Sequence, residues 1–385
     1  MQKSGAGAKI LPTLLVVAGL IAVAWWLRLP EKRDQPNERT PSIETGNRTH
    51  PPQLGTANRA RVSPDIAATA QALKLGNDRV DSLKQVDALR RRLTGLGTQA
   101  ASLAVQEWLD SGVDTPTLLG FSLSPDGRLK EAPTLRLFLL DYLIQIDAQA
   151  AGAYAEKILR SPSAADEWSV SLRAYALAYP TAEARAYLQR KVREMIGIQA
   201  WRDNPSTGFL EAFDIMVYTR DRELTPQLAD WVRRPDNGAL AHAAYLALDR
   251  LVQAEPAEVL GQLQSQPDLL EGREGTRADY FARADVRDSQ QRMVLENYLL
   301  DPNRSLVELQ KFAATYPNAN SMVSYNLLTQ TRTPTGAEIA ARDREALRVV
   351  QDWMSDTRFA RVQSQLQVIK SRLEQFVKLS SPSQP

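Results

Sequence analysis

Proline recurs along this chain as punctuation, and it constrains the fold more than any other feature. From Ser63 onward the apolar residues keep a helical spacing almost throughout. Prolines interrupt that spacing, mostly every 15 to 30 residues, at Pro162, Pro180, Pro205, Pro235, Pro256, Pro267, Pro302, Pro317 and Pro334. Because proline lacks a backbone donor and clashes with the preceding turn, each one bounds a helix. The sequence therefore predicts an all-α domain of single helices and short helix pairs.

Capping residues mark several helix starts. Ser63 precedes Pro64, which suits the first position of a helix, and Thr181 follows Pro180. Ser163 stands three residues before Asp166, a capping-box variant with Asp in place of Glu or Gln. We expect helices to begin at these three places.

A weak internal repeat accompanies the helices. The pattern apolar-Asp-x-apolar occurs at Leu140–Leu143, Phe213–Met216 and Leu248–Leu251. The first and third copies extend further, since Gln145 and Asp147 match Gln253 and Glu255 at an offset of 108. Repeated helix pairs that bury their faces on their neighbours are typical of an α-solenoid.

This arrangement resembles that of HEAT and armadillo repeats over roughly residues 132–330. The resemblance implies an irregular HEAT-like α-solenoid, with a right-handed superhelix, occupying residues 63–335. The period is uneven, so an irregular helical bundle is the alternative. One segment departs from helix: Pro125-Asp126-Gly127 forms a turn signal between two alternating stretches, which predicts a small β-hairpin near residues 121–130.

The C-terminal part, residues 336–379, reads as a helical hairpin or cap. Its last helix carries apolar residues at 3-4-3-4-3 spacing: Phe359, Val362, Leu366, Ile369, Leu373 and Phe376. We call the first five the heptad seam. Packing against the preceding helices is one interpretation. The other is a short coiled coil with a partner or with a second copy, in which case the heptad seam is a partner-binding surface.

The N-terminus predicts a membrane anchor at residues 10–29. Eighteen residues without charge separate Lys9 from Arg28, near the minimum for a transmembrane helix. The predicted anchor residues are Leu14, Leu15, Val16, Val17, Leu20, Ile21, Trp25 and Trp26. Basic residues within 1–9 should keep that end in the cytoplasm, so the bulk of the chain would lie in the periplasm of a bacterium, attached to the inner membrane. A cleaved signal peptide ending at Ala22-Val23-Ala24 is the alternative.

Residues 30–62 predict a disordered linker. They are rich in proline and polar residues, and their few apolar residues are isolated, so they cannot bury enough surface to offset the cost of ordering. A flexible chain of this length reaches roughly 30 Å on average. The linker would keep the helical domain near the membrane without fixing its orientation.

Composition argues against several function classes. There is no cysteine and there are only two histidines, so thiol chemistry is excluded and histidine metal sites are disfavoured. The 47 basic and 45 acidic residues give a net charge of +2, which offers no general attraction to nucleic acid. We expect no cofactor or metal and find no catalytic constellation. Asp166 and Glu167 are adjacent, and adjacent residues diverge by about 100° on a helix. The densest basic run, Arg90, Arg91 and Arg92, is the second candidate partner-binding surface.

A short segment resembles the signature of membrane-anchored lipase foldases. It runs from Asp126-Gly-Arg-Leu129 through Leu135-Arg136 to Asp141-Tyr142-Leu143. The resemblance implies a steric chaperone that wraps a secreted enzyme. Here the aspartate stands five residues after Arg136, whereas the family's stands four after and follows a phenylalanine.

The leading hypothesis is a membrane-anchored, extracytoplasmic scaffold or adaptor that binds a protein partner and is not an enzyme. The foldase-like chaperone is one alternative. A helical-toroid hydrolase using paired carboxylates is the other.

Overall fold

The computed structural model describes residues 63–160, 163–234, 236–320 and 324–380. Across these ranges the chain is mostly helical, with a two-stranded antiparallel ribbon. The predicted anchor at residues 10–29 and the predicted linker at residues 30–62 lie outside them. Of the helices that the model describes, none has the length and apolar character needed to cross a membrane.

The α-helices are α2 (Pro64–Leu75), α3 (Arg79–Gly95), α4 (Thr98–Asp110), α5 (Leu135–Ile146), α6 (Ala148–Ile158), α7 (Ala165–Ala178), α8 (Ala182–Gly197), α9 (Gln199–Asp203), α10 (Thr207–Glu211), α11 (Phe213–Thr219), α12 (Thr225–Arg233), α13 (Gly238–Ala254), α14 (Pro256–Ser265), α15 (Glu274–Phe281), α16 (Ser289–Leu300), α17 (Leu306–Thr315), α18 (Gly336–Ser355) and α19 (Gln363–Ser380). Short 3-10 turns are η1 (Arg222–Leu224), η2 (Pro267–Leu270) and η3 (Thr357–Val362).

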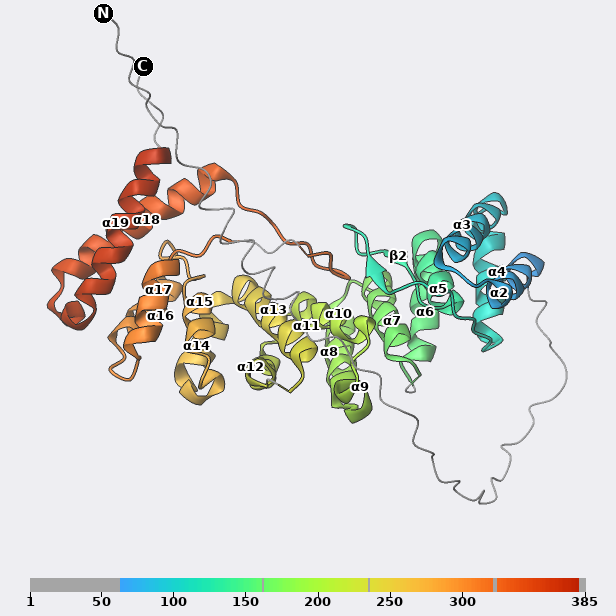
Figure 1. Cartoon of the computed structure of the whole chain (residues 1–385), viewed down its shortest axis with the longest axis horizontal. Helices are drawn as coiled ribbons and strands as arrows, with labels where there is room; N and C mark the ends of the chain where they lie inside the picture. The colour runs from blue at the N-terminus through green and yellow to red at the C-terminus, as the bar shows by residue number, and fades with distance from the viewer. Residues whose placement is uncertain (1–62, 161–162, 235, 321–323, 381–385) are drawn as a thin grey trace, which may run out of the picture. The chain divides into compact units, whose positions relative to one another are not determined.

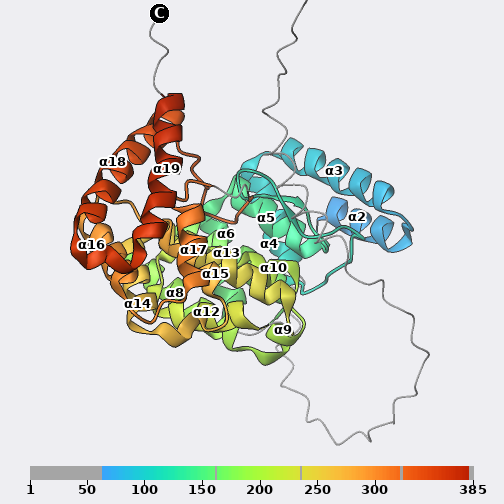
Figure 2. The ribbon, with the colours of Figure 1, turned by 60° about the vertical axis from the view of Figure 1, so that its left-hand side comes forward.

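Neighbours in sequence are neighbours in space through this helical array. α6 packs against α7, α7 against α8, α12 against α13, and α13 against α14. Other contacts skip one element, as between α11 and α13 or between α15 and α17. Figure 1 shows the resulting succession from α2 to α19, and the turned view of Figure 2 shows α18 and α19 side by side. In such stepwise packing, each helix pair buries its apolar face against the neighbouring pairs.

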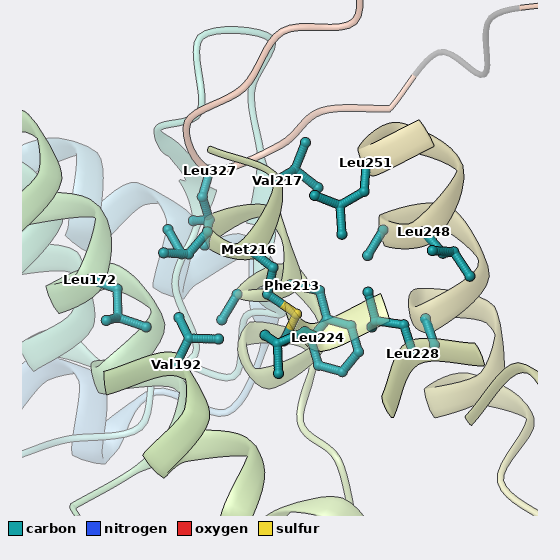
Figure 3. Packing of buried hydrophobic residues seen from close by; sticks show 14 of the residues in the cluster. Leu172, Val192, Phe213, Met216, Val217, Leu224, Leu228, Leu248, Leu251 and Leu327 are labelled. Atoms are coloured by element: carbon teal, nitrogen blue, oxygen red, sulfur yellow. The ribbon is translucent and has the colours of Figure 1, made fainter. Parts of the chain in front are cut away.

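Large side chains fill the spaces between successive helices. Trp168 and Trp231 are almost fully buried, and Trp108 and Trp353 are nearly so. Figure 3 shows part of this core, where Phe213 of α11 lies among leucines of neighbouring helices. Burying one such side chain contributes about 1.5–3 kcal/mol, so the helix interfaces supply most of the stability of the array.

Helices begin at or next to all three predicted places, but the predicted capping box at Ser163 is wrong. α2 begins at Pro64 directly after Ser63, and the Thr181 side chain accepts a hydrogen bond from Ala184 N at the start of α8. The expected capping box at Ser163 does not form, because α7 starts after Ala164 without a side-chain cap. The carboxylate of Asp166 serves another helix: it accepts hydrogen bonds from Ser206 Oγ and from Gly208 N, 2.9 Å away, at the start of α10.

The predicted hairpin is confirmed as β1 (Ser122–Leu123) paired with β2 (Leu129–Glu131). Its turn closes where Gly127 N donates to Ser124 O at 2.9 Å. Gly127 has a φ of +78°, a left-handed conformation that favours glycine.

The C-terminal helices α18 and α19 pack against each other, and α19 also packs against α17. α18 opens with a capping box, in which the Thr335 hydroxyl accepts from Glu338 N and the Glu338 carboxylate accepts from Thr335 N. All five residues of the heptad seam have an exposed fraction of 0 %. The heptad seam is therefore used inside the array.

Candidate functional site: a return segment held by aspartate–arginine pairs

The three aspartates of the repeat all form ion pairs with arginines that lie on a later helix or just after its end. Asp141 pairs with Arg173 at 2.7 Å, with both side chains at most 3 % exposed. Asp249 and Arg283 form two bonds of 2.9 Å each. Asp214 of α11 pairs with Arg250 of α13. Each pair joins residues 32 to 36 positions apart, and so links one helix pair to the next.

The repeat that the sequence suggested has a physical basis in these pairs. Gln145 donates to Asp141 Oδ2 at 2.7 Å, and Gln253 donates to Asp249 Oδ2 at 2.8 Å. The amide one turn later therefore orients the carboxylate in both copies. Asp147 caps the following helix by accepting from Ala150 N, whereas its counterpart Glu255 forms no such cap at the start of α14.

An extended part of the chain runs back from the end of α17 to the hairpin, and we call residues 318–320 and 324–334 the return segment. Figure 1 shows the path between α17 and α18. Asp214 Oδ2 accepts from Leu328 N at 2.5 Å and from Thr329 N at 2.9 Å. Arg250 donates to the side chains of Asn326, at 3.1 Å, and of Thr329.

The Asp249–Arg283 pair also bonds to the return segment, whereas the Asp141–Arg173 pair holds the hairpin against which the return segment lies. Arg283 donates to the carbonyls of Asn318 and Asn320. Arg173 donates to Gly127 O at the tip of the hairpin, and a Cβ on Gly127 would overlap Leu327 O. Leu327 is itself buried in the core beside α11 (Figure 3). The return segment therefore bonds to two of the pairs and packs against the hairpin that the third pair holds.

These contacts recognise backbone more than side chains. Arg173 and Arg283 donate to peptide carbonyls, and Asp141 and Asp214 accept from peptide N–H groups, including Leu129 N at 3.1 Å from Asp141. Arg250 is the exception, because it donates to the side chains of Asn326 and Thr329. Hydrogen bonds to ionised groups are stronger than neutral ones. A row of paired carboxylates and guanidiniums can therefore hold an extended polypeptide of varied sequence.

Glu211 is a strongly perturbed carboxyl close to the Asp214–Arg250 pair. Burial raises its pKa from 4.5 to about 7, the negative charge of Asp214 adds to the rise, and Arg250 opposes it. Among the described residues it has no hydrogen-bond or ion-pair partner. It is therefore partly protonated near neutral pH.

Two open clefts lie along the return segment. The first, of about 430 Å³, is lined by Arg185, Arg220, Arg250 and Arg332 together with neutral residues. The second, of about 360 Å³, is lined by Arg283, Arg332, Arg342, Asp285 and neutral residues. Gln253 and Arg332 line both clefts, so the two adjoin.

The residues that the sequence predicted to bind a partner do not line the two clefts. Arg90 lies over the Phe138 ring at 5.0 Å, Arg92 donates to Thr69 Oγ1 at 2.8 Å, and Arg91 is exposed. The basic run is thus divided between different contacts and does not form one patch. The buried heptad seam could meet a partner only if α19 left its neighbours.

Other residues noted in the sequence form hydrogen bonds or ion pairs within the helical array. Arg136, in the foldase-like segment, donates to Glu167 Oε1 at 2.8 Å and to Leu109 O at 2.7 Å. Asp141, in the same segment, is the buried partner of Arg173. Asp166 and Glu167 bind different elements, α10 and α5, so these two carboxylates do not converge on one point.

The sequence alone does not identify the arginines of the three pairs as functional residues. Their only signal is spacing, since an arginine follows each repeat aspartate by 32 to 36 residues on a later helix or at its end. The return segment gave no signal, because it lacks periodicity.

No family model, no curated protein and no solved structure matches this chain.

Proposed function

We propose that this chain is a membrane-anchored, HEAT-like helical-repeat scaffold that binds an extended segment of a protein partner along the path of the return segment. The observation that carries the proposal is the set of bonds from Asp214, Arg250 and Arg283 to the return segment. They are directed at an irregular stretch of chain rather than at a helix or sheet. The return segment already occupies these donors and acceptors, so a partner segment would lie beside it, along the two clefts that it lines.

The apolar residues 10–29 support an anchor, and the basic residues before them support a cytoplasmic N-terminus. The helical domain would then meet its partner in the periplasm. The stepwise packing and the repeated aspartate–arginine pairs support kinship with HEAT-type repeats, in which neighbouring units bury a continuous core.

Site-specific photo-crosslinking in membranes tests the binding face. A benzophenone amino acid at Gln330, which is exposed and lines the first cleft, should crosslink to a protein partner. The same group at exposed Glu271, which lines neither cleft, is the control. Crosslinks that are absent at position 330, or equal at both positions, would remove the basis of the proposal. If the crosslinked protein is a secreted hydrolase that needs this chain to become active, the foldase-like alternative gains its support.

A further inference from the structure

The two clefts beside the return segment carry more positive charge than their surroundings neutralise. Four of their arginines have a carboxylate partner: Arg220 with Glu255, Arg250 with Asp214, Arg283 with Asp249, and Arg332 with Glu338. Arg185 and Arg342 have none within 4.0 Å in the described residues. Each cleft therefore contains one guanidinium that forms no ion pair with the described residues.

The two unpaired arginines differ in setting. Arg342 is largely buried, and its guanidinium donates only to backbone carbonyls, those of Asn318 at 3.2 Å, Ala282 at 3.2 Å and Arg283 at 3.3 Å. Burial lowers its pKa, and the negative charges of Asp285 and Asp343, which form no ion pair with it, oppose the shift. Arg185 is exposed and lies over the ring of Tyr218, 5.6 Å from its centroid.

The shape of the site favours a polymer over a small anion. The basic residues of the first cleft come from α8, the end of α11, α13 and the return segment. The second cleft continues past Arg332 toward α18. A small anion could satisfy one cleft, whereas an extended chain with spaced negative charges could fill both.

We infer that the adjoining clefts bind acidic side chains of an extended polypeptide, with the carboxylates opposite Arg185 and Arg342. This rests on the proposed function, because it names the chemistry of the partner that the array would bind. Arginine matches a carboxylate with paired donors, and opposite charge in a partly buried cleft speeds association and fixes the register of the bound chain.

The test measures binding of a rhodamine-labelled peptide of four Glu-Ser repeats, blocked at both ends, to the full-length chain in detergent. The same peptide with Gln in place of Glu is the neutral control. The acidic peptide should bind at least about tenfold more tightly, and its affinity should fall as salt is raised. Equal binding of the two peptides would overturn the inference.

Arg185→Gln should weaken the acidic peptide about tenfold. Arg190→Gln is the matched control, since Arg190 is also exposed on α8 and lies over a tyrosine ring, that of Tyr187, at 5.8 Å. Arg332→Gln, at the junction of the clefts, should weaken binding as well. Because the Arg332 side chain is exposed, this substitution should not disturb folding. Equal loss in the Arg185 and Arg190 variants would contradict the assignment to these clefts.

Inorganic phosphate separates a polypeptide site from a small-anion site. Phosphate should displace the peptide only by general screening. At equal ionic strength, phosphate and sodium chloride should therefore displace the same fraction of the peptide. Displacement by phosphate at a much lower ionic strength than sodium chloride requires would overturn the polypeptide assignment. Crosslinking from position 330 reports separately on the proposed function: crosslinks that persist while the acidic peptide fails to bind would refute this inference alone.

Discussion

Single residues decide how closely the return segment approaches the rest of the array. Gly127 is the sharpest case, because an added Cβ would overlap Leu327 O and lie 2.8 Å from Asn326 O. Gly97 has the same φ of +78° but nothing within 4 Å of its missing Cβ. Substitutions at the two glycines therefore distinguish the cost of a positive φ from the cost of a steric clash with the return segment.

Gly127→Ala should destabilise the protein more than Gly97→Ala. Both substitutions force a side chain to a φ of +78°, which costs about 1–3 kcal/mol. The Gly127 variant must also displace the return segment, at a further cost of about 1–3 kcal/mol. Urea unfolding of the two variants measures the difference, and equal losses would show that the contact with residues 326 and 327 contributes nothing.

Glu211 makes stability depend on pH. Its pKa is about 7 in the folded protein and 4.5 as the reference, so the folded state binds more protons between these values. Stability should therefore fall as pH rises from about 4.5 to 7 and then level off. Glu211→Gln removes this loss and should stabilise the protein by about 1–2 kcal/mol at pH 8 but little at pH 5.

Unfolding of the wild type and of Glu211→Gln across pH 5–8 checks this expectation. Glu271→Gln, at an exposed position, is the control and should leave the pH profile nearly unchanged. A stability difference at position 211 that stays constant with pH would show that Glu211 does not titrate in this range.

At the scale of elements, hydrophobic periodicity and the positions of proline predict most of the secondary structure. Regular helices, the hairpin and the C-terminal helix pair follow from local spacing and capping, and all are found. A helix begins close to Ser163, at Ala165, but the predicted capping box does not form. Asp166 instead accepts hydrogen bonds at the start of α10, a tertiary contact that local sequence does not reveal. The arginine partners and the return segment depend on contacts between residues far apart in sequence, such as Asp214 and Thr329, and no local pattern encodes them.

The heptad seam should stabilise the array from within. Leu366→Ala removes a side chain that is 0 % exposed and should cost about 2–4 kcal/mol. Val368→Ala, on the same helix but 52 % exposed, should cost less than about 0.5 kcal/mol. Both losses should be independent of protein concentration. If the unfolding midpoint of the wild type rose with concentration, the seam would instead be shared with a second copy.

At the scale of the whole described array, the return segment changes the connectivity. Helical repeats usually contact only their neighbours, so their parts can unfold in separate steps. Here Asp214 accepts from residues 114 and 115 positions later, and Arg283 holds the carbonyls of Asn318 and Asn320. Together with the bonds from Arg250, they tie α11, α13 and the end of α15 to one extended segment, which also lies against the hairpin at Gly127. They should make unfolding more cooperative than nearest-neighbour packing alone allows.

Arg250→Met tests this coupling, because Arg250 contacts Asp214, Asn326 and Thr329 together. Removing one partner of a buried ion pair costs about 3–5 kcal/mol. The variant should release the return segment and lower the dependence of unfolding free energy on urea, as the transition separates into steps. Tryptophan fluorescence and far-ultraviolet circular dichroism should then give different midpoints. Arg348→Met, which breaks two ion pairs of an arginine that is 55 % exposed, is the control and should keep them coincident. Coincident transitions in the Arg250 variant as well would mean that nearest-neighbour packing alone makes the array cooperative.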